Sequence, residues 1–344
     1  MAEYAILILP ATNRVYAESS AALTMAELSL FSQVALGSAV QNVAQTSIGG
    51  IPYITFESDE LSDRDVALLA NLSSIYALFR IDGKFLEPVY LQSLDKLDSD
   101  LISIQKYQGK TNELFTKLLL NVTLLSSKFA EQMLDRKFSV IDPLCGRGTT
   151  MNQALMYGFD AAGVDLDRKD FDAYATFIQT WLKRKRLKHD AAVVRVRREH
   201  EVVARRLEVS LGLTKEGWKA GDALTLSYVN ADTTKALEFH RPGSFDLVVT
   251  DAPYGVQHGS RTAESGLHRS PIDLLKAAVP TWAGLLRSGG ALGIAWNTNV
   301  ARRSAATEIL ADAGLEPLDE PPYTDFVHRV DQAIVRDIVV ARRP

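Results

Sequence analysis

The sequence predicts an α/β protein in which a Rossmann-like, doubly wound sheet follows a small α+β domain. After residue 112, short apolar runs alternate with helical stretches, as parallel strands joined by right-handed crossovers do. Two of these runs end in unusual turns, Asp142–Thr149 and Asp251–Gly255. The first hundred residues show shorter and more closely spaced elements. We therefore expect one domain at 1–100 and another at 101–344.

The N-terminal domain is expected to follow a β-α-β-β-α-β order, which is typical of ferredoxin-like domains. Its expected elements are strands at 4–9, 74–81 and 85–91, helices at 21–33 and 61–72, and a hairpin at 40–57. Glycine tolerates the positive φ of a tight turn, so the hairpin should turn at Gly49 and Gly50. The acidic segment 95–100 is the expected linker.

The C-terminal domain is expected to begin with one long helix at 112–136. Its strands are expected at 138–141, 161–164, 245–250, 291–296 and 332–341, in a parallel sheet. The last of these strands would close the sheet at its edge. Residues 183–211 interrupt the alternation, and we interpret them as a basic helical insertion.

Composition disfavours disulfide-rich, secreted and membrane proteins. The single cysteine, Cys145, fits a reducing compartment. We find neither a secretory signal nor an apolar run of about eighteen residues, so we expect a cytoplasmic protein. The six histidines show no metal-ligand spacing with Cys145 or with one another, so no metal is expected.

Charge is distributed unevenly along the chain. Residues 1–100 contain five Lys and Arg against thirteen Asp and Glu, whereas residues 183–206 contain ten against three. Such a basic segment favours contact with a polyanion, although a solvated helix face or a dimerising helix are alternatives. The residues expected to bind nucleic acid are Arg184, Arg186, Arg197 and Arg198.

A Gly-rich turn follows the strand that ends at Asp142. Gly146 and Gly148 let the backbone approach a ligand, and the next helix offers free N–H groups. The third glycine of a dinucleotide fingerprint would fall at Met151, which disfavours a nicotinamide-dependent oxidoreductase. A structural turn is the alternative to a cofactor turn. The expected cofactor-binding residues here are Asp142, Pro143, Gly146 and Gly148.

Two further acidic positions are candidates for the cofactor's adenosine part. Asp165 ends the next strand and can accept hydrogen bonds from a ribose diol, while Asp167 is better placed to cap the following helix. We interpret Asp222 and Ala223 as a third strand end, from which Asp222 would accept an adenine amino group.

The stretch Asp251-Ala252-Pro253-Tyr254 fits chemistry on an aromatic amine. Such an amine is a poor nucleophile because its lone pair is delocalised into the ring. Asp251 can accept one amine N–H and the Ala252 carbonyl the other, which tilts the lone pair out of the plane. Pro253 stiffens the loop, and Tyr254 offers a ring on which a base can stack. An ordinary Pro-Tyr turn is the alternative.

Together these motifs resemble the DPPY-type amino methyltransferases, which use S-adenosylmethionine. The segments Tyr107–Asn112 and Leu118–Asn121 resemble those of tRNA guanine-N2 methyltransferases. The resemblance implies that Thr111 and Asn112 meet the methionine end of the cofactor, although Thr111 could instead cap a helix.

The resemblance covers roughly residues 105–341 and implies methyl transfer to guanine N2 of tRNA. It departs from the family pattern twice. Ala252 replaces the usual proline, and the interval before Tyr107 is too short for an RNA-binding THUMP domain as well as the ferredoxin-like one. Two alternatives remain: a DNA adenine-N6 or cytosine-N4 methyltransferase, and a non-catalytic RNA- or partner-binding protein with this fold.

Overall fold

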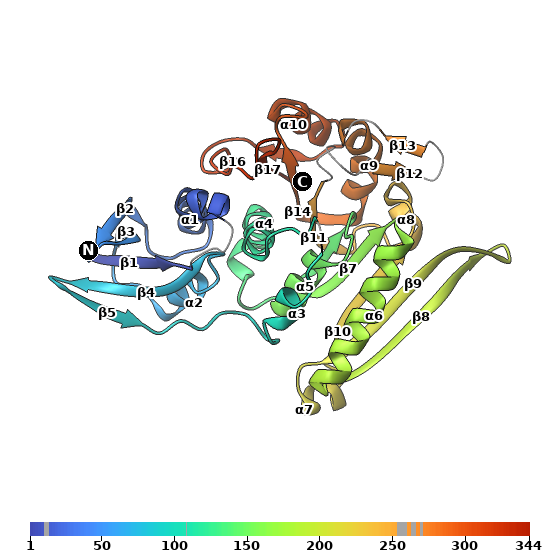
Figure 1. Ribbon diagram of the computed structural model, residues 1–344, viewed down its shortest axis with the longest axis horizontal. Helices are drawn as coiled ribbons and strands as arrows, with labels where there is room; N and C mark the ends of the chain where they lie inside the picture. The colour runs from blue at the N-terminus through green and yellow to red at the C-terminus, as the bar shows by residue number, and fades with distance from the viewer. Residues whose placement is uncertain (10–13, 108, 253–259, 263–265, 269–270) are drawn as a thin grey trace.

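The computed structural model describes residues 1–9, 14–107, 109–252, 260–262, 266–268 and 271–344. Two β-sheets follow one another along the long axis of the molecule (Figure 1). Helix α4 (Glu113–Ser126) lies between them, beside α1 (Arg14–Val34). Within these described ranges, none of the helices has the length and apolar character needed to cross a membrane.

The N-terminal sheet is antiparallel, with the order β2-β3-β1-β4-β5. Its elements are β1 (Ala2–Ile8), α1, β2 (Gln41–Ile48), β3 (Ile51–Ser58), α2 (Asp63–Leu69), β4 (Ile75–Asp82) and β5 (Phe85–Val89). Strand β3 lies between the two strands that α1 joins, which confirms the predicted ferredoxin-like arrangement. Gly49 and Gly50 turn the hairpin with φ of 59° and 84°. Ser62 caps α2 by accepting from the Asp65 amide.

The larger sheet has the order β15-β17-β14-β11-β6-β7-β10-β9-β8, and β16 pairs with β17. Its strands are β6 (Ser139–Asp142), β7 (Asp160–Asp165), β8 (Lys188–Arg198), β9 (Glu201–Gly212), β10 (Leu224–Asn230), β11 (Phe245–Asp251), β14 (Leu286–Asn297), β15 (Glu316–Leu318), β16 (His328–Arg329) and β17 (Val335–Arg342). A separate pair is formed by β12 (Ser260–Thr262) and β13 (Gly266–His268).

Only the centre of this sheet is parallel. Strands β14, β11, β6, β7 and β10 run in one direction, whereas β9 and β17 are antiparallel to their central neighbours. The prediction of a wholly parallel sheet is therefore wrong at both flanks. Strand β17 also lies one position inside the edge, because the short strand β15 pairs with its outer side.

Helices cover both faces of the larger sheet. The remaining elements are α3 (Asp100–Ser103), the 3₁₀ turn η1 (Ala130–Gln132), α5 (Thr149–Met156), α6 (Arg168–Lys185), α7 (Lys215–Lys219), η2 (Thr233–Lys235), α8 (Ala236–Phe239), α9 (Pro271–Leu285) and α10 (Arg303–Asp312). Helices α4, α5 and α6 pack into one apolar cluster, and α8, α9 and α10 into another. Along β11, Leu247 belongs to the first cluster and Val248 to the second. Burial on both faces explains why β11 is apolar without alternation.

Residues 183–211 do not form the predicted basic helix. Helix α6 ends at Lys185, and the following residues form a long hairpin of β8 and β9 that extends the sheet beyond β10. The β-branched residues Val193, Val194 and Val196 favour extended backbone. Glu199 and His200 form the turn with φ of 46° and 70°, values more usual for Gly or Asn. The sequence therefore lacks the usual hairpin signal.

The predicted helix at 112–136 ends early, at Ser126. Ser127 is extended, with ψ of 163°, and its side-chain hydroxyl donates to the Leu124 carbonyl at 2.7 Å. The next amide, that of Lys128, donates to the Gly289 carbonyl in β14. This tertiary contact turns the chain toward the sheet at a point where the apolar periodicity of the sequence predicts that the helix continues.

The apolar core is continuous across residue 100. Leu28 of α1 and Leu118 of α4 belong to the same cluster. Glu27 of α1 accepts from Asn121 Nδ2 at 2.7 Å and from Ser73 Oγ at 2.6 Å at the same junction, and burial raises the pKa of Glu27. Asn121 thus lies where the two sheets meet and not at the cofactor turn.

Candidate active site

Three of the predicted acidic residues end neighbouring parallel strands. Asp142 ends β6, Asp165 ends β7 and Asp251 ends β11. Since β6 lies between β11 and β7, these carboxylates line one edge of the sheet. Open α/β sheets bind their ligands at this carboxyl edge. The structure therefore brings the predicted cofactor turn and the predicted catalytic aspartate to the same edge.

The two glycines of the turn are required for different reasons. Gly146 and Gly148 both have positive φ, 47° and 80°. A Cβ atom at Gly148 would lie 2.3 Å from Tyr174 Cε2, so packing excludes any side chain there. A Cβ atom at Gly146 would meet nothing within 4 Å. The backbone at Gly146 therefore borders open space, which fits the close approach of a bound cofactor.

Asp165 joins the turn to the end of β7. Its Oδ2 accepts from the Gly146 amide at 2.9 Å, and its Oδ1 accepts from the Asp167 amide at 2.8 Å. Burial raises the pKa of Asp165 to about 6. Asp167 caps α6 by accepting from the Lys169 amide at 2.7 Å, as the sequence predicts. Binding of a ribose diol by Asp165 stays a prediction.

Asp142 is a buried carboxyl group at the start of the turn. It is 4% exposed and accepts from the Leu144 amide at 3.0 Å. Burial raises the pKa of Asp142 to about 7, and the neighbouring charge of Asp165 adds to this effect. Buried carboxyl groups with perturbed pKa values are typical of functional sites.

Tyr107 and Arg147, which we did not predict as site residues, cover the turn. The Tyr107 hydroxyl lies 3.0 Å from Thr149 Oγ1, and the Arg147 guanidinium lies 4.9 Å from the Tyr107 ring centroid. Arg147 Nε donates to Asp170 Oδ1 at 2.8 Å. Tyr107 opens the segment that resembles the tRNA enzymes, so the structure places this segment against the Gly-rich turn.

Thr111 and Asn112 have different roles in the structure. Thr111 Oγ1 donates to Asp251 Oδ2 at 2.7 Å, which links the segment to the predicted catalytic loop. Asn112 caps α4, because its Oδ1 accepts from the Leu114 and Phe115 amides. The cap therefore falls on Asn112, and the helix begins at Glu113.

Arg336 is a site residue that sequence reasoning missed. Its Nη2 lies 3.8 Å from Asp251 Oδ2, and its side chain is 6% exposed. The guanidinium lies 4.1 Å from the Phe115 ring centroid, and the His328 ring packs 5.2 Å from the same ring. Burial lowers the pKa of His328 to about 4. The only sequence signal for Arg336 is a charged residue at the start of an apolar strand.

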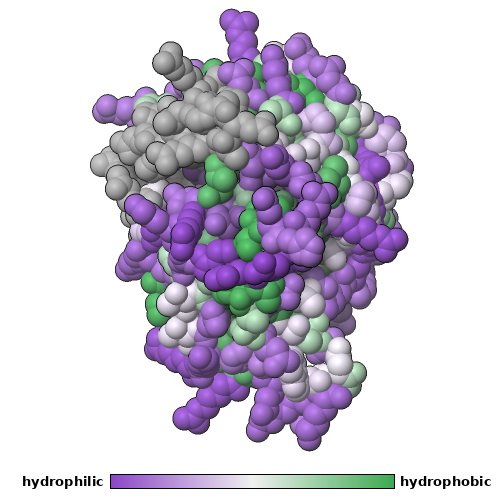
Figure 2. Space-filling model, turned by 90° about the vertical axis from the view of Figure 1, so that its right-hand side faces the viewer, coloured by the Kyte–Doolittle hydropathy of each residue, from purple (hydrophilic) through white to green (hydrophobic). Residues whose placement is uncertain are grey.

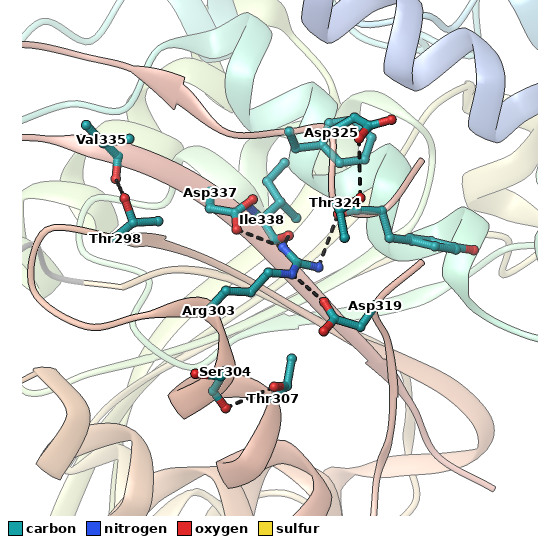
Figure 3. A network of polar contacts seen from close by, with 12 residues as sticks. Thr298, Arg303, Ser304, Thr307, Asp319, Thr324, Asp325, Val335, Asp337 and Ile338 are labelled. Atoms are coloured by element: carbon teal, nitrogen blue, oxygen red, sulfur yellow. Dashed lines mark hydrogen bonds and ion pairs between the residues drawn. The ribbon is translucent and has the colours of Figure 1, made fainter. Parts of the chain in front are cut away.

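A second arginine holds the strand that carries Arg336. Arg303, the first residue of α10, extends between Asp337 and Asp319 (Figure 3). Its Nη1 donates to Asp337 Oδ2 at 2.7 Å and to the Ile338 carbonyl at 2.9 Å. Because Asp337 follows Arg336 directly, this network fixes the backbone of β17 beside Asp251.

Asp222 and Ala223 do not reach the carboxyl edge. They precede β10, which is parallel to β7, so they lie at its amino end. The predicted strand end at Asp222 is therefore wrong. The carboxyl end is Asn230, which is opposite Asp165 and whose Nδ2 donates to the Asp165 carbonyl at 2.9 Å. Asn230 therefore lies at the edge position that we expected for Asp222. Just beyond it, Asp232 caps η2, with its Oδ1 accepting from the Thr234 amide at 2.9 Å.

The catalytic stretch is only partly described. Ala252 is buried, and its amide donates to the Ala295 carbonyl of β14 at 2.9 Å. Pro253 and Tyr254 lie outside the described residues. The roles of these three residues stay predictions.

The four predicted RNA-binding arginines do not form one surface. Arg184 and Arg186 lie at the carboxyl end of α6, whereas Arg197 and Arg198 end β8. At about 3.3 Å per residue, the length of β8 separates the two pairs by roughly 35 Å. Strand β8 has the same direction as β10, so only Arg197 and Arg198 lie toward the catalytic edge.

A protein-family model matches the part of the chain that contains this site. Residues 125–291 match the UPF0020 family model, described as an RMKL-like methyltransferase domain. No curated protein sequence matches the chain. The matched region contains the Gly-rich turn, the hairpin and Asp251.

Several solved structures are similar to the chain at low identity. A TehB-like S-adenosylmethionine-dependent methyltransferase from Corynebacterium glutamicum is 15% identical, with 61% of this chain and 82% of that chain covered and a TM-score of 0.34. Magnesium protoporphyrin IX methyltransferase from Synechocystis PCC 6803 is 13% identical, with 69% and 87% covered and a TM-score of 0.39. TehB from Haemophilus influenzae is 10% identical, with 90% and 87% covered and a TM-score of 0.40.

The fold assignment depends on the strand order and on the family match. Strands β14, β11, β6, β7 and β10 are parallel and β17 beside β14 is antiparallel, so the sheet is mixed. The family match over residues 125–291 is to a methyltransferase domain. The chain therefore has the mixed α/β fold of S-adenosylmethionine-dependent methyltransferases, preceded by an antiparallel sheet domain.

Proposed function

We propose that the protein methylates an exocyclic amine of a nucleobase in RNA, with guanine N2 of tRNA as the first candidate. The observation that carries this proposal is the position of Asp251. It ends β11 on the same edge as the Gly-rich turn, and Thr111 donates to it at 2.7 Å. A carboxylate held there can accept an N–H from an amine that faces the methyl donor.

S-adenosylmethionine fits the residues on this edge and supplies an electrophilic methyl group on sulfur. Gly146, which borders open space, and Asp165, which ends β7, would hold it. Asn230 and Asp232 would border its adenine, in place of Asp222. Asp142 is buried beneath the turn and would stabilise its shape through the Leu144 amide.

The chain's own groups then act on the target amine. Asp251 accepts one amine N–H and stabilises the positive charge that develops on nitrogen. The Ala252 carbonyl accepts the other, and Tyr254 stacks on the base. Arg336 and Thr111 hold the Asp251 carboxylate in place, since both contact its Oδ2.

RNA is preferred over DNA because the family match supports an RNA methyltransferase family. tRNA is preferred among RNAs because Tyr107–Asn112 and Leu118–Asn121 resemble the tRNA guanine-N2 enzymes. We also place the protein in the cytoplasm, and its domain boundary near residue 100.

The test is methyl transfer from labelled S-adenosylmethionine to unmodified tRNA, to total RNA and to DNA, followed by nucleoside analysis. We expect N2-methylguanosine with the wild-type protein and none with Asp251→Asn, which keeps the side chain's size. Asp312→Asn, an exposed residue of α10, is the matched control. Label in DNA adenine or cytosine would overturn the RNA assignment. Cofactor binding without transfer to any nucleic acid would favour a non-catalytic binding protein.

A further inference from the structure

The far end of the β8–β9 hairpin stands past the catalytic edge of the sheet. Asn230, the last residue of β10, is opposite Arg205, and β9 continues beyond this pair from Ala204 back to Glu201. At about 3.3 Å per residue, these residues project roughly 13 Å past the edge. Figure 1 shows the hairpin reaching beyond α8. We call residues 195–204 the hairpin arm.

The hairpin arm is fixed to helices on both faces of the sheet, once at its tip and once next to its base. Arg198 pairs with Glu238 of α8 at 2.6 Å, and Arg205 pairs with Asp172 of α6 at 2.7 Å. Since these contacts already order the arm, binding a partner would cost it little conformational entropy. They also neutralise Arg198, which sequence reasoning had assigned to nucleic acid.

Two other arginines of the arm are available to a ligand. Arg195 and Arg197 are exposed, and neither has a carboxylate partner within the described residues. Beside them, Val202 and Val203 are 48% and 43% exposed. Figure 2, which views the side that bears the hairpin, shows hydrophobic patches among hydrophilic side chains. Phosphate-binding cations next to apolar contact surface suit a nucleic acid.

A second copy of the chain is a poorer fit to this surface. Pairing of two β8 edges would need a regular strand with free backbone groups. The register of β8 shifts between Val196 and Arg197, and a bulge of this kind twists an edge strand away from pairing. Arginines along the same strand also oppose edge-to-edge addition, because two copies would bring like charges together.

We infer that the hairpin arm docks structured RNA through phosphates at Arg195 and Arg197. This inference relies on the proposed function for the identity of the polyanion. Five strand spacings of about 4.8 Å separate β8 from β11, so the arm lies roughly 24 Å from Asp251. A folded RNA spans this distance, and a trinucleotide at Asp251 does not. The arm should therefore select for RNA size and shape.

The experiment compares two pairs of exposed arginines, one on the hairpin arm and one at the carboxyl end of α6. The test variant is Arg195→Gln with Arg197→Gln, and the matched control is Arg184→Gln with Arg186→Gln at the opposite edge of the sheet. Affinity for fluorescein-labelled, transcribed tRNA is measured by anisotropy at several salt concentrations. Methyl transfer to this tRNA and to a guanosine-containing trinucleotide is measured in parallel.

We expect the test variant to bind tRNA about tenfold more weakly, with a salt slope smaller by about 1.4 to 1.8. Transfer to the trinucleotide should be unchanged. Unchanged tRNA affinity, or an equal loss in the control pair, would overturn the inference. A change in oligomeric state by light scattering would instead assign the arm to a second copy.

Failure of this inference and failure of the proposed function give different results. If no RNA is methylated but the affinity difference persists, only the proposed function fails. If tRNA is methylated equally well by both variants and bound equally well, only the arm inference fails.

Discussion

Replacing Thr111 with valine removes one hydrogen bond from the candidate catalytic carboxylate and leaves the side-chain shape almost unchanged. Thr111 Oγ1 donates to Asp251 Oδ2 at 2.7 Å in a part-buried position. A hydrogen bond to a charged group contributes about 1.5 to 3 kcal/mol. At about 1.36 kcal/mol per tenfold change in rate, we expect Thr111→Val to lower the rate constant of methyl transfer by about tenfold to about 150-fold.

The assay is single-turnover methyl transfer to the RNA substrate at saturating S-adenosylmethionine. Thr111→Ser keeps the hydroxyl and should retain most of the rate. Thr176→Val, on the exposed face of α6, controls for a threonine-to-valine replacement far from Asp251. Cofactor affinity, measured separately by calorimetry, should be the same in all four proteins.

Two results would refute the reasoning. Loss of cofactor affinity with an unchanged single-turnover rate would place Thr111 at the methionine end of the cofactor, as the family resemblance implies. A Thr111→Ser variant as slow as Thr111→Val would show that the methyl group matters and that the hydroxyl contact does not.

Three further predictions concern stability. Gly148→Ala should lower the free energy of unfolding by about 3 kcal/mol, because a Cβ atom would lie 2.3 Å from the Tyr174 ring and the backbone φ is 80°. Chemical denaturation measures this loss, and a value below about 1 kcal/mol would contradict the prediction. Burial raises the pKa of Asp142 from 3.8 to about 7. The stability that the protonated carboxyl group contributes is therefore complete below pH 4 and is lost as the pH rises through 7. The loss is on the order of 4 kcal/mol in the free energy of unfolding. Asp142→Asn should therefore raise the melting temperature of the cofactor-free protein at pH 8 but not at pH 4, and an equal effect at both would argue against this titration. Arg303→Met should lower the free energy of unfolding by about 3 to 5 kcal/mol, because it leaves Asp337 buried without this partner. In the same denaturation experiment, the double variant with Asp337→Asn should recover part of that loss.

The central strands and the cofactor turn could be predicted because their signals are local. An apolar run that ends in an acidic residue and a Gly-rich turn marks β6, and Asp251 marks the end of β11 in the same way. Gly221 and Asp222 mimic this pattern, but an apolar strand follows them and none precedes them. The real strand end, Asn230, lacks the acidic residue that guided the interpretation.

The missed features depend on contacts between distant segments. Arg336 reaches Asp251 only because β17 inserts between β14 and β15, and no local pattern encodes that order. The hairpin of β8 and β9 was missed because hydrophobic periodicity in a basic segment fits either a helix or a strand. Its turn at Glu199 and His200 also lacks glycine.

The antiparallel insertion of β17 has a consequence for biosynthesis. Arg336 and the network that holds it belong to a strand that is translated after every other element of the sheet. A nascent chain that has already exposed the Gly-rich turn and Asp251 still lacks the cation beside that carboxylate. Synthesis that stops before Val335 would leave a product without Arg336 beside Asp251. Among the described strands of the sheet, the one that supplies the cation beside Asp251 is therefore made last.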